Sequence, residues 1–572
     1  MNKYDSFYAT LRKTMFIISL CAFFLILYFI NAINAVVLLF FYILYFISYD
    51  HDYVFCKPTD QKKRSISIVL SGVLAIFLLK SFFSIYEEKT VEQISFISDH
   101  CGLSYSIILF LIDLLFVISS LYFMYIFIYH FADGIGTVTK NIKINEIFRN
   151  IVFPFSDGLL KLIVCFLAKI IMSVLIGFVL LTIVMSIPEN SIENNVKESA
   201  FYLSKEDTYE EVYDWCYSKL DNFTDSIMLL ETVCKTDKPL LERTLYVYRD
   251  TIEGKNPHEV LADRYVNKAE RTSVLSYPQY WHEYLVTLKP LLLFFNYQQI
   301  RVLNTILQMV LVFIICCVLL KKDRKEFVIP FIVSLLMMMP IVISKSLQYS
   351  TCYYLMLLFS LLVLFNDKLK LHYNDIFIFS GIATAYFDFL TYPLVNLCLP
   401  LIFFLICNND KLIERKLSSI ILYSTLFFLS YGSMWLGKWV FTDLLLNSRI
   451  VSTGINSVLY RTAGTAADGT KLPFLYVMSL NVNIFFDTPF AFLSGLFIIL
   501  SVFIRKKNNI NFDELVINGF PYCMISLFPF IWFMILRNHT AIHVFFASKV
   551  LFVSVFSILC VYARMYKEGS LV

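Results

Sequence analysis

Charged residues are scarce in this sequence, since Asp, Glu, Lys and Arg together make up 16% of its 572 residues. A typical soluble domain carries about 25% charged residues. Glycine (16) and proline (15) are also few, whereas hydrophobic residues reach 58%. These proportions exclude an ordinary soluble protein, and the small net charge of +4 gives no indication of a nucleic acid partner.

The sequence also lacks the short motifs of soluble enzymes. It contains no Walker A, GxGxxG, HExxH or GxSxG pattern, which argues against ATP-driven transport and nucleotide chemistry. The thirteen cysteines form no CxxC pair and no Cys/His cluster with zinc spacing. We therefore expect no cofactor; a divalent metal is the single possibility that the sequence leaves open. Cys216 and Cys234 share a long polar segment and either form a disulfide or stay free thiols.

What the sequence does have is a succession of long apolar runs. Together they predict an all-α, polytopic membrane protein with about fourteen transmembrane helices. The first run has no small-residue cleavage site and is followed at once by a second, so we expect a retained helix and not a signal peptide. The runs lie at residues 14–30, 33–49, 66–86, 104–130, 159–187, 300–320, 327–344, 352–365, 375–390, 394–407, 418–436, 488–504, 517–536 and 543–563.

Lys and Arg residues indicate how these helices are oriented. They concentrate in alternate short loops, and the positive-inside rule places those loops and both termini in the cytoplasm of a cell membrane. The long segments 188–299 and 437–487 are then exterior. The first is acidic and helically patterned, which predicts a helical subdomain. The second contains many small residues, including Thr453–Asn456, and predicts a mobile loop or lid.

We expect two modules along the chain. Residues 1–150 would form four membrane helices followed by a cytoplasmic linker, and residues 151–572 would form the second membrane module with both exterior segments.

A pair of acids in the first exterior segment is one candidate site. Asp221 and Asp225 are four residues apart, which places them on one face of a helix. Neighbouring carboxylates repel, and this raises the pKa of one of them, as suits a general base or a metal clamp. The alternative is a solvated acidic face with a helix N-cap.

Aromatic and polar residues gather where the chain re-enters the membrane. Trp281, His282 and Glu283 suit contacts to a sugar ring, although an interfacial aromatic belt is an equally simple explanation. Near the last helix, Arg537, His539 and His543 suit a phosphate or a sugar. The two histidines are one helical turn apart, but without a third ligand they do not define a metal site.

Charges inside apolar runs are costly and indicate function by default. Asp388 and Lys549 both lie toward the exterior ends of their runs, with Tyr392 close to Asp388 in sequence. Lys549 would neutralise a lipid phosphate or pair with Asp388; Lys169 has no evident partner. All these candidates map to the exterior half of the protein. That distribution favours chemistry on an exterior lipid-linked substrate over transport through a midplane site.

One spanning helix (159–187), a long acidic exterior segment (188–299) and a series of short-looped helices together resemble the GT-C glycosyltransferases over residues 159–563. Residues 220–229, 277–292, 386–395 and 537–546 also resemble recurring segments of a poorly characterised bacterial multi-pass family. The GT-C resemblance implies an integral membrane enzyme that transfers a sugar from a polyprenyl-phosphate donor to a cell-envelope glycan or lipid-linked acceptor. No nucleotide is needed.

The resemblance also implies roles for individual residues. Asp221 or Asp225, otherwise Glu189, would deprotonate the acceptor, and Arg301, Arg537 and Lys549 would stabilise the departing phosphate. Glu189 remains a candidate because GT-C enzymes place an acid soon after the first core helix. The alternatives are a polysaccharide polymerase or ligase, a transporter or flippase of lipid-linked glycans, and a membrane scaffold.

Overall fold

The structure is a computed structural model that describes residues 142–152, 159–409, 411–503 and 512–568. It divides into two compact units. The described part of the first unit is limited to residues 142, 499–503, 512–520 and 568. The second unit comprises residues 143–498 and 521–567 and contains both cavities and the candidate site described below. The predicted N-terminal four-helix module lies almost wholly outside the described residues.

The described chain is predominantly helical, which confirms the coarse prediction of an α-helical, membrane-type fold. Six helical segments are long and apolar enough to cross a membrane, and a seventh is added if the bent pair α22–α23 counts as one span. Fourteen spans remain a prediction. The six segments are Ile163–Met185, Tyr297–Lys321, Leu347–Leu364, Ile413–Leu446, Ile517–Ile535 and Val544–Ala563.

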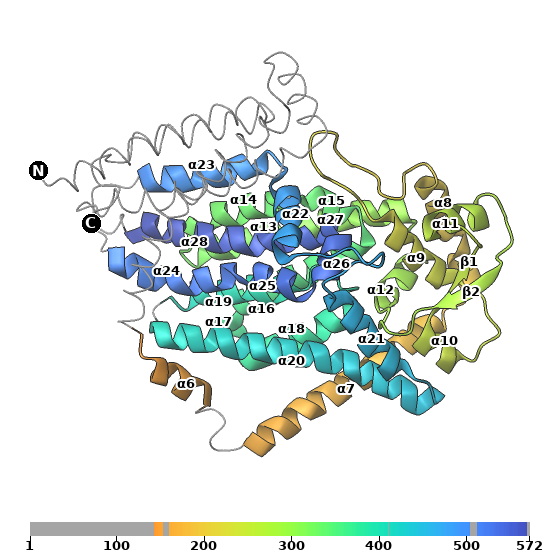
Figure 1. The fold of residues 1–572 in the computed structure, drawn as a ribbon, viewed down its shortest axis with the longest axis horizontal. Coiled ribbons are helices and arrows are strands. Elements are labelled where there is room, and N and C mark those ends of the chain that lie inside the picture. The colour runs from red at the N-terminus through yellow and green to blue at the C-terminus, as the bar shows by residue number, and fades with distance from the viewer. Residues whose placement is uncertain (1–141, 153–158, 410, 504–511, 569–572) are drawn as a thin grey trace, which may run out of the picture. The chain divides into compact units, whose positions relative to one another are not determined.

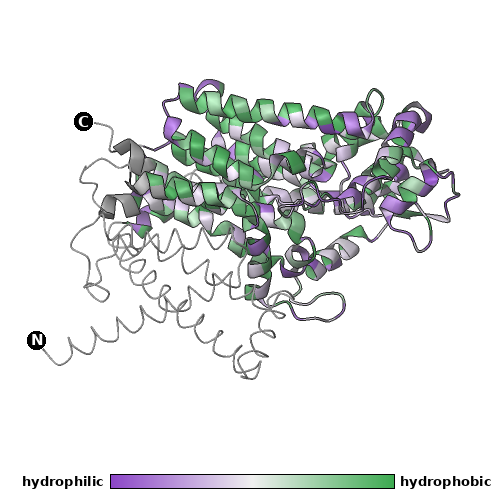
Figure 2. Ribbon diagram, turned by 90° about the horizontal axis from the view of Figure 1, so that it is seen from above, coloured by the Kyte–Doolittle hydropathy of each residue, from purple (hydrophilic) through white to green (hydrophobic). Residues whose placement is uncertain are grey.

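The helices of the membrane-type bundle run side by side in Figure 1. Their ribbon is mainly hydrophobic in Figure 2, because the exposed side chains of segments such as α7 and α13 are themselves apolar. The elements are α6 (Ile144–Val152), α7 (Leu159–Met185), α13 (Tyr297–Lys321), η3 (Lys325–Phe327), α14 (Val328–Met337), α15 (Pro340–Ser344), α16 (Leu347–Leu364), α17 (Asn366–Leu369), α18 (Tyr373–Phe387), α19 (Leu394–Cys407), α20 (Ile413–Leu446), α21 (Ile450–Thr462), α22 (Phe474–Phe486), α23 (Phe490–Phe503), α24 (Phe512–Ser526), α25 (Phe528–Ile535), α26 (Arg537–Ile542), α27 (Val544–Ala547), η4 (Ser548–Leu551) and α28 (Phe552–Glu568).

A small subdomain fills the first long polar segment, at one end of the bundle (Figure 1). It has its own core, which includes Val196, Leu229 and Leu285 and extends onto the end of α7 and the start of α13. The helical prediction for this segment is correct except for one two-stranded antiparallel sheet. Its elements are α8 (Glu189–Leu203), α9 (Asn222–Val233), α10 (Leu240–Tyr246), β1 (Tyr248–Thr251), α11 (Pro257–Tyr265), β2 (Ser273–Ser276) and α12 (Tyr284–Leu291). Cys216 and Cys234 are free thiols.

Two predicted boundaries are wrong. The helix expected over 418–436 is the 34-residue α20, about 50 Å long, and continues to Leu446. The second polar segment is also largely helical, and Thr453–Asn456, expected in a mobile loop, lie within α21. A local contact helps to fix the start of α21, because Asp443, only seven residues before Ile450, accepts hydrogen bonds from the backbone N–H groups of Ile450 and Val451.

Candidate functional site

The run expected as one helix over 327–344 is broken at its polar end. Helix α14 stops at Met337, and α15 begins at Pro340. Between them Met339 has a left-handed backbone conformation (φ 60°), which is strained for a residue with a side chain. The break frees the carbonyl of Met338, which accepts a hydrogen bond from the Lys549 Nζ at 3.1 Å. Strained breaks of this kind are typical of functional sites.

An apolar groove opens beside this break. Its volume is about 520 Å³, within the range of pockets that bind small molecules. Two strongly exposed side chains on α13, Met309 (66%) and Phe313 (68%), form part of its rim, so the groove is open along the lipid-facing side of the bundle. It is lined by Tyr213, Trp215, Thr305, Gln308, Met309, Val312, Phe313, Cys316, Ile332, Leu335, Leu336, Met339, Pro340, Ile341, Ser344, Tyr353 and Phe490.

A second, smaller cavity lies on the other side of Met339, and we call it the lysine cavity. It holds about 20 Å³, enough for a single water molecule. Its lining residues are Tyr217, Met337, Met339, Ile484, Phe485, Asp487, Thr488, Phe545, Ser548 and Lys549. Met339 lines both cavities, so the apolar groove and the lysine cavity adjoin at one residue with a flexible, unbranched side chain.

Lys549 is the cationic side chain of the lysine cavity. It is 7% exposed, and its Nζ lies 5.6 Å from the centre of the Tyr349 ring. It does not pair with Asp388, because Asp388 instead accepts from the backbone N–H of Thr391 at 3.0 Å. A carbonyl and an aromatic ring do not neutralise a buried ammonium ion, and Asp487, which lines the same cavity, forms no ion pair with Lys549 within 4.0 Å. Lys549 therefore remains available to an anionic ligand.

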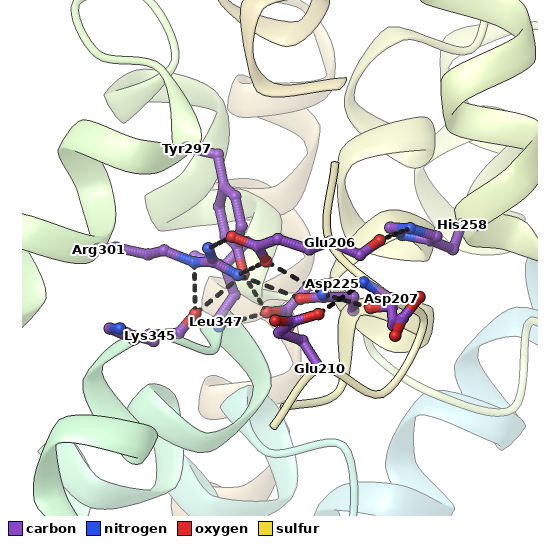
Figure 3. Close-up of polar contacts among 10 residues, drawn as sticks. Glu206, Asp207, Glu210, Asp225, His258, Tyr297, Arg301, Lys345 and Leu347 are labelled. Carbon is purple, nitrogen blue, oxygen red and sulfur yellow. Dashed lines mark hydrogen bonds and ion pairs between the residues drawn. The ribbon is translucent and has the colours of Figure 1, made fainter. Parts of the chain in front are cut away.

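The second predicted acid, Asp225, is fully engaged by the start of α16. Its carboxylate accepts from the backbone N–H of Leu347 (2.9 Å) and from the Tyr297 hydroxyl (Figure 3). It also accepts from the backbone N–H of Gln348 (3.0 Å) and from Ser346 Oγ. These contacts cap α16 from a distant part of the chain. Four donors from the protein bind the Asp225 carboxylate, so its burial is explained by a structural role.

Arg301 serves the same junction. Its guanidinium makes a forked pair with Glu206 (2.5 and 2.9 Å) and donates to the Lys345 carbonyl at 2.7 Å (Figure 3). A further hydrogen bond reaches Asn222 Oδ1 at 3.1 Å. Arg301 thus joins α13 to the subdomain and to the start of α16. These protein partners are sufficient to explain the position of the Arg301 side chain.

Asp221 and Glu189 differ in their surroundings. Asp221 is the N-cap of α9 and accepts from both the backbone N–H and the hydroxyl of Thr224. It is 2% exposed, and burial raises its pKa to about 7. Asp221 lies near Tyr349, whose ring also contacts Lys549. Glu189 is paired with Arg243, at the start of α8.

The predicted aromatic segment forms a buried polar network. Trp281 Nε1 donates to the Met434 carbonyl at 3.0 Å. His282 Nε2 donates to the Tyr277 carbonyl at 2.8 Å, and its Nδ1 lies 3.1 Å from Glu231 Oε2. His282 also has a positive φ of 60°. His282 therefore links Glu231 to the backbone at Tyr277 and has a structural role in this network.

Glu283 and Lys438 form the most unusual part of this region. Both are fully buried, and neither the Glu283 carboxylate oxygens nor the Lys438 Nζ has a hydrogen-bond partner. Burial raises the pKa of Glu283 well above its usual value, and the opposite charge of Lys438 acts against this shift. Lys438 Nζ lies 5.7 Å from the centre of the Trp281 ring.

The C-terminal candidates converge on the segment 388–392. His539 Nε2 donates to the Leu390 carbonyl at 2.8 Å, and Arg461 donates to its Nδ1 at 2.7 Å. Burial, followed by His543 and Arg461, lowers the pKa of His539 well below its usual value. The rings of His539 and His543 are 4.9 Å apart, but among the described residues no group of three His, Cys, Asp or Glu could hold a metal.

Tyr392 and Arg537 complete the set of predicted residues. The Tyr392 hydroxyl donates to the Tyr349 carbonyl at 2.5 Å. Tyr392 therefore supports Tyr349, whose ring lies beside Lys549. Arg537 lies against the turn at Gly464 and its Nε has no hydrogen-bond partner. Of the predicted residues, Lys549 alone lines the lysine cavity.

Sequence reasoning missed two residues that line the cavities, Met339 and Asp487, and the buried cation Lys438 beside Glu283. Met339 and Asp487 belong to no sequence motif, and Met339 stands out only because the helix is interrupted between α14 and α15. Lys438 was assigned to an exterior loop because the apolar run was ended at Leu436; a longer helix would have marked it as a buried charge.

Comparison with known proteins adds no further constraint: no protein-family model, curated protein or solved structure matches this chain.

Proposed function

We propose that this protein is a membrane glycosyltransferase that moves a sugar from a polyprenyl-phosphate donor to a cell-envelope glycan or lipid-linked acceptor. The observation that carries this proposal is the meeting of the apolar groove and the lysine cavity at Met339. A ligand with an apolar chain and an anionic head group matches an apolar groove that adjoins a cavity lined by a lysine. The lipid-linked sugar phosphates have that chemistry.

Each part of such a donor has a counterpart in the groove and cavity. The isoprenoid chain would lie only in the part of the groove formed by α13 and α14–α15, entering past Met309 and Phe313, and would leave the part lined by Tyr213 and Trp215 to the head group. The phosphate would reach Lys549 with Ser548 and Thr488 beside it as hydroxyl donors. Because the lysine cavity holds about 20 Å³, Met339 must move aside to admit the phosphate. Methionine is suited to this because its side chain is flexible.

The reaction needs an acid–base group and a charge that stabilises the leaving group. The acceptor oxygen attacks the anomeric carbon as the bond from that carbon to the phosphate oxygen breaks, with inversion. The electron pair leaves with the phosphate, which Lys549 stabilises, and the acceptor proton passes to a carboxylate. We assign that role to Asp487, because it lines the lysine cavity and Asp221 does not.

The proposal also assigns faces of the membrane. The subdomain of residues 186–296 and the lysine cavity would be exterior, in keeping with the distribution of Lys and Arg in the sequence. In a cysteine-free background, Lys235→Cys in the subdomain should react with an impermeant maleimide in intact cells. Lys325→Cys, at the far end of α13, should react only after permeabilisation. The reverse pattern would overturn the exterior assignment.

The central experiment is transfer by the purified protein in lipid nanodiscs, supplied with radiolabelled polyprenyl-phosphate sugars and cell-envelope glycan. We expect free polyprenyl phosphate to appear with the labelled glycan. Asp487→Asn should slow transfer about 100-fold or more, and exposed Asp237→Asn, outside both cavities, should have no effect. If Asp221→Asn slows transfer and Asp487→Asn does not, Asp221 is the base. Movement of intact donor between leaflets without bond cleavage would indicate a flippase and refute the proposal.

A further inference from the structure

Residues 211–219 form a closed loop beside both cavities, which we call the aromatic loop. Glu211 and Lys219 pair as an antiparallel bridge at its base. Within it, the Ser218 hydroxyl accepts from the Tyr213 N–H at 2.8 Å and donates to the Tyr213 carbonyl at 3.1 Å. Tyr349 donates to the Lys219 carbonyl at 3.2 Å, which ties the loop to α16. These bonds give the loop a defined shape.

Three aromatic side chains of this loop reach the cavities. Tyr213 and Trp215 line the apolar groove, and Tyr217 lines the lysine cavity. The rings of Tyr213 and Trp215 are 4.9 Å apart, and Trp215 meets Phe490 edge to face at 6.3 Å. The aromatic loop therefore spans the junction at which a lipid chain would give way to its head group.

Trp215 differs from the other tryptophans in its exposure. It is 55% exposed, whereas Trp281 is 1% and Trp439 is 8% exposed. Packing within the protein does not account for a large apolar ring left half open. The C–H face of a pyranose is an apolar surface that stacks on aromatic rings, and its hydroxyls bind polar groups at the edge.

We propose that Tyr213, Trp215 and Tyr217 bind the sugar ring attached to the phosphate of the lipid-linked donor. This inference rests on the proposed function and adds a sugar site to it. Asp487, which lines the lysine cavity beside Tyr217, can accept hydrogen bonds from sugar hydroxyls. Its negative charge favours a neutral sugar over a uronic acid.

Binding measurements with short-chain probes test the assignment. The probes are farnesyl phosphate and farnesyl-phosphoryl glucose, galactose, mannose, N-acetylglucosamine and glucuronic acid, titrated into the full-length protein in nanodiscs. We expect at least one neutral glycosylated probe to bind about tenfold more tightly than farnesyl phosphate, as a single aromatic stacking contact can provide. The glucuronic acid probe should bind more weakly than that neutral probe.

Variants then assign the preference to the loop. Trp215→Ala should abolish the preference and leave binding of farnesyl phosphate within about twofold, and Trp215→Phe should retain part of it. Tyr202→Ala removes another exposed aromatic of the same subdomain (42%) and should change neither probe. Lys549→Met should weaken both probes alike.

The outcomes separate the two proposals. If Trp215→Ala weakens both probes equally, or if no sugar improves binding, the sugar site is refuted and the lipid-phosphate site stands. If no probe binds in a manner that depends on Lys549, the proposed function itself fails.

Discussion

Lys549 and Met338 are joined by one hydrogen bond of 3.1 Å, from the ammonium group to the carbonyl at the end of α14. The bond exists because the helix breaks at Met338 and Met339 and leaves that carbonyl without a helical partner. The broken helix and the buried cation therefore form one structural feature, positioned between the apolar groove and the lysine cavity.

Replacing Lys549 with methionine removes the cation and keeps a similar volume. We expect Lys549→Met to slow glycosyl transfer about 100- to 1,000-fold, because the leaving phosphate loses its counter-charge. The midpoint of thermal unfolding should change little, since a costly buried charge is lost together with one hydrogen bond. Exposed Lys325→Met is the matched control. Activity of Lys549→Met within threefold of the wild type would contradict this role.

The buried acid Asp221 makes stability depend on pH. Its pKa is raised from 3.8 to about 7, so the folded protein holds this proton more tightly than the unfolded chain. The free energy of unfolding should therefore fall by about 1 kcal/mol for each pH unit between about pH 4 and 7, and this contribution should level off above pH 7. Asp221→Asn should lack this dependence. Thermal unfolding from pH 4.5 to 8 measures the pH dependence of the wild type and of Asp221→Asn. Equal slopes of unfolding free energy against pH in the two proteins would refute the role of Asp221.

The forked pair of Arg301 and Glu206 should hold the subdomain on α13. Arg301 is 5% exposed, and lysine cannot reproduce its fork or its bond to the Lys345 carbonyl. We expect Arg301→Lys to lower the free energy of unfolding by about 2–4 kcal/mol. Lys235→Met removes an exposed pair with Glu193 in the same subdomain and should cost less than about 1 kcal/mol. Equal losses, measured by thermal unfolding in detergent, would contradict the assignment.

Glu283 and Lys438 should be energetically coupled, because both are fully buried and each acts on the other with an opposite charge. Glu283→Gln or Lys438→Met alone leaves an uncompensated buried charge and should destabilise the protein by about 3–5 kcal/mol. The double variant should lose less than the sum of the two. A double-mutant cycle by thermal unfolding checks this, and additive losses would show the groups to be independent.

Part of the site was readable in the sequence, because it depends on local chemistry. The acid Asp221 followed by a helical pattern indicates an N-cap, and Lys549 stands out as a cation in an apolar run. Asp225 was not interpretable in this way. Its partners, residues 346–348, follow it by more than a hundred positions, and only folding brings them to its carboxylate.

The sequence by itself determined the class of the protein and the position of its large polar segment, because hydrophobicity and charge are properties of each residue. Only the tertiary structure decided where helices break or continue. Met339 has a left-handed backbone conformation and lines two cavities to which α13, α22 and η4 also contribute. Helix α20 runs on to Leu446, and its last turns, with Lys438 and Trp439, pack against residues 279–283. Such contacts join residues far apart in the chain, so no local pattern contains them.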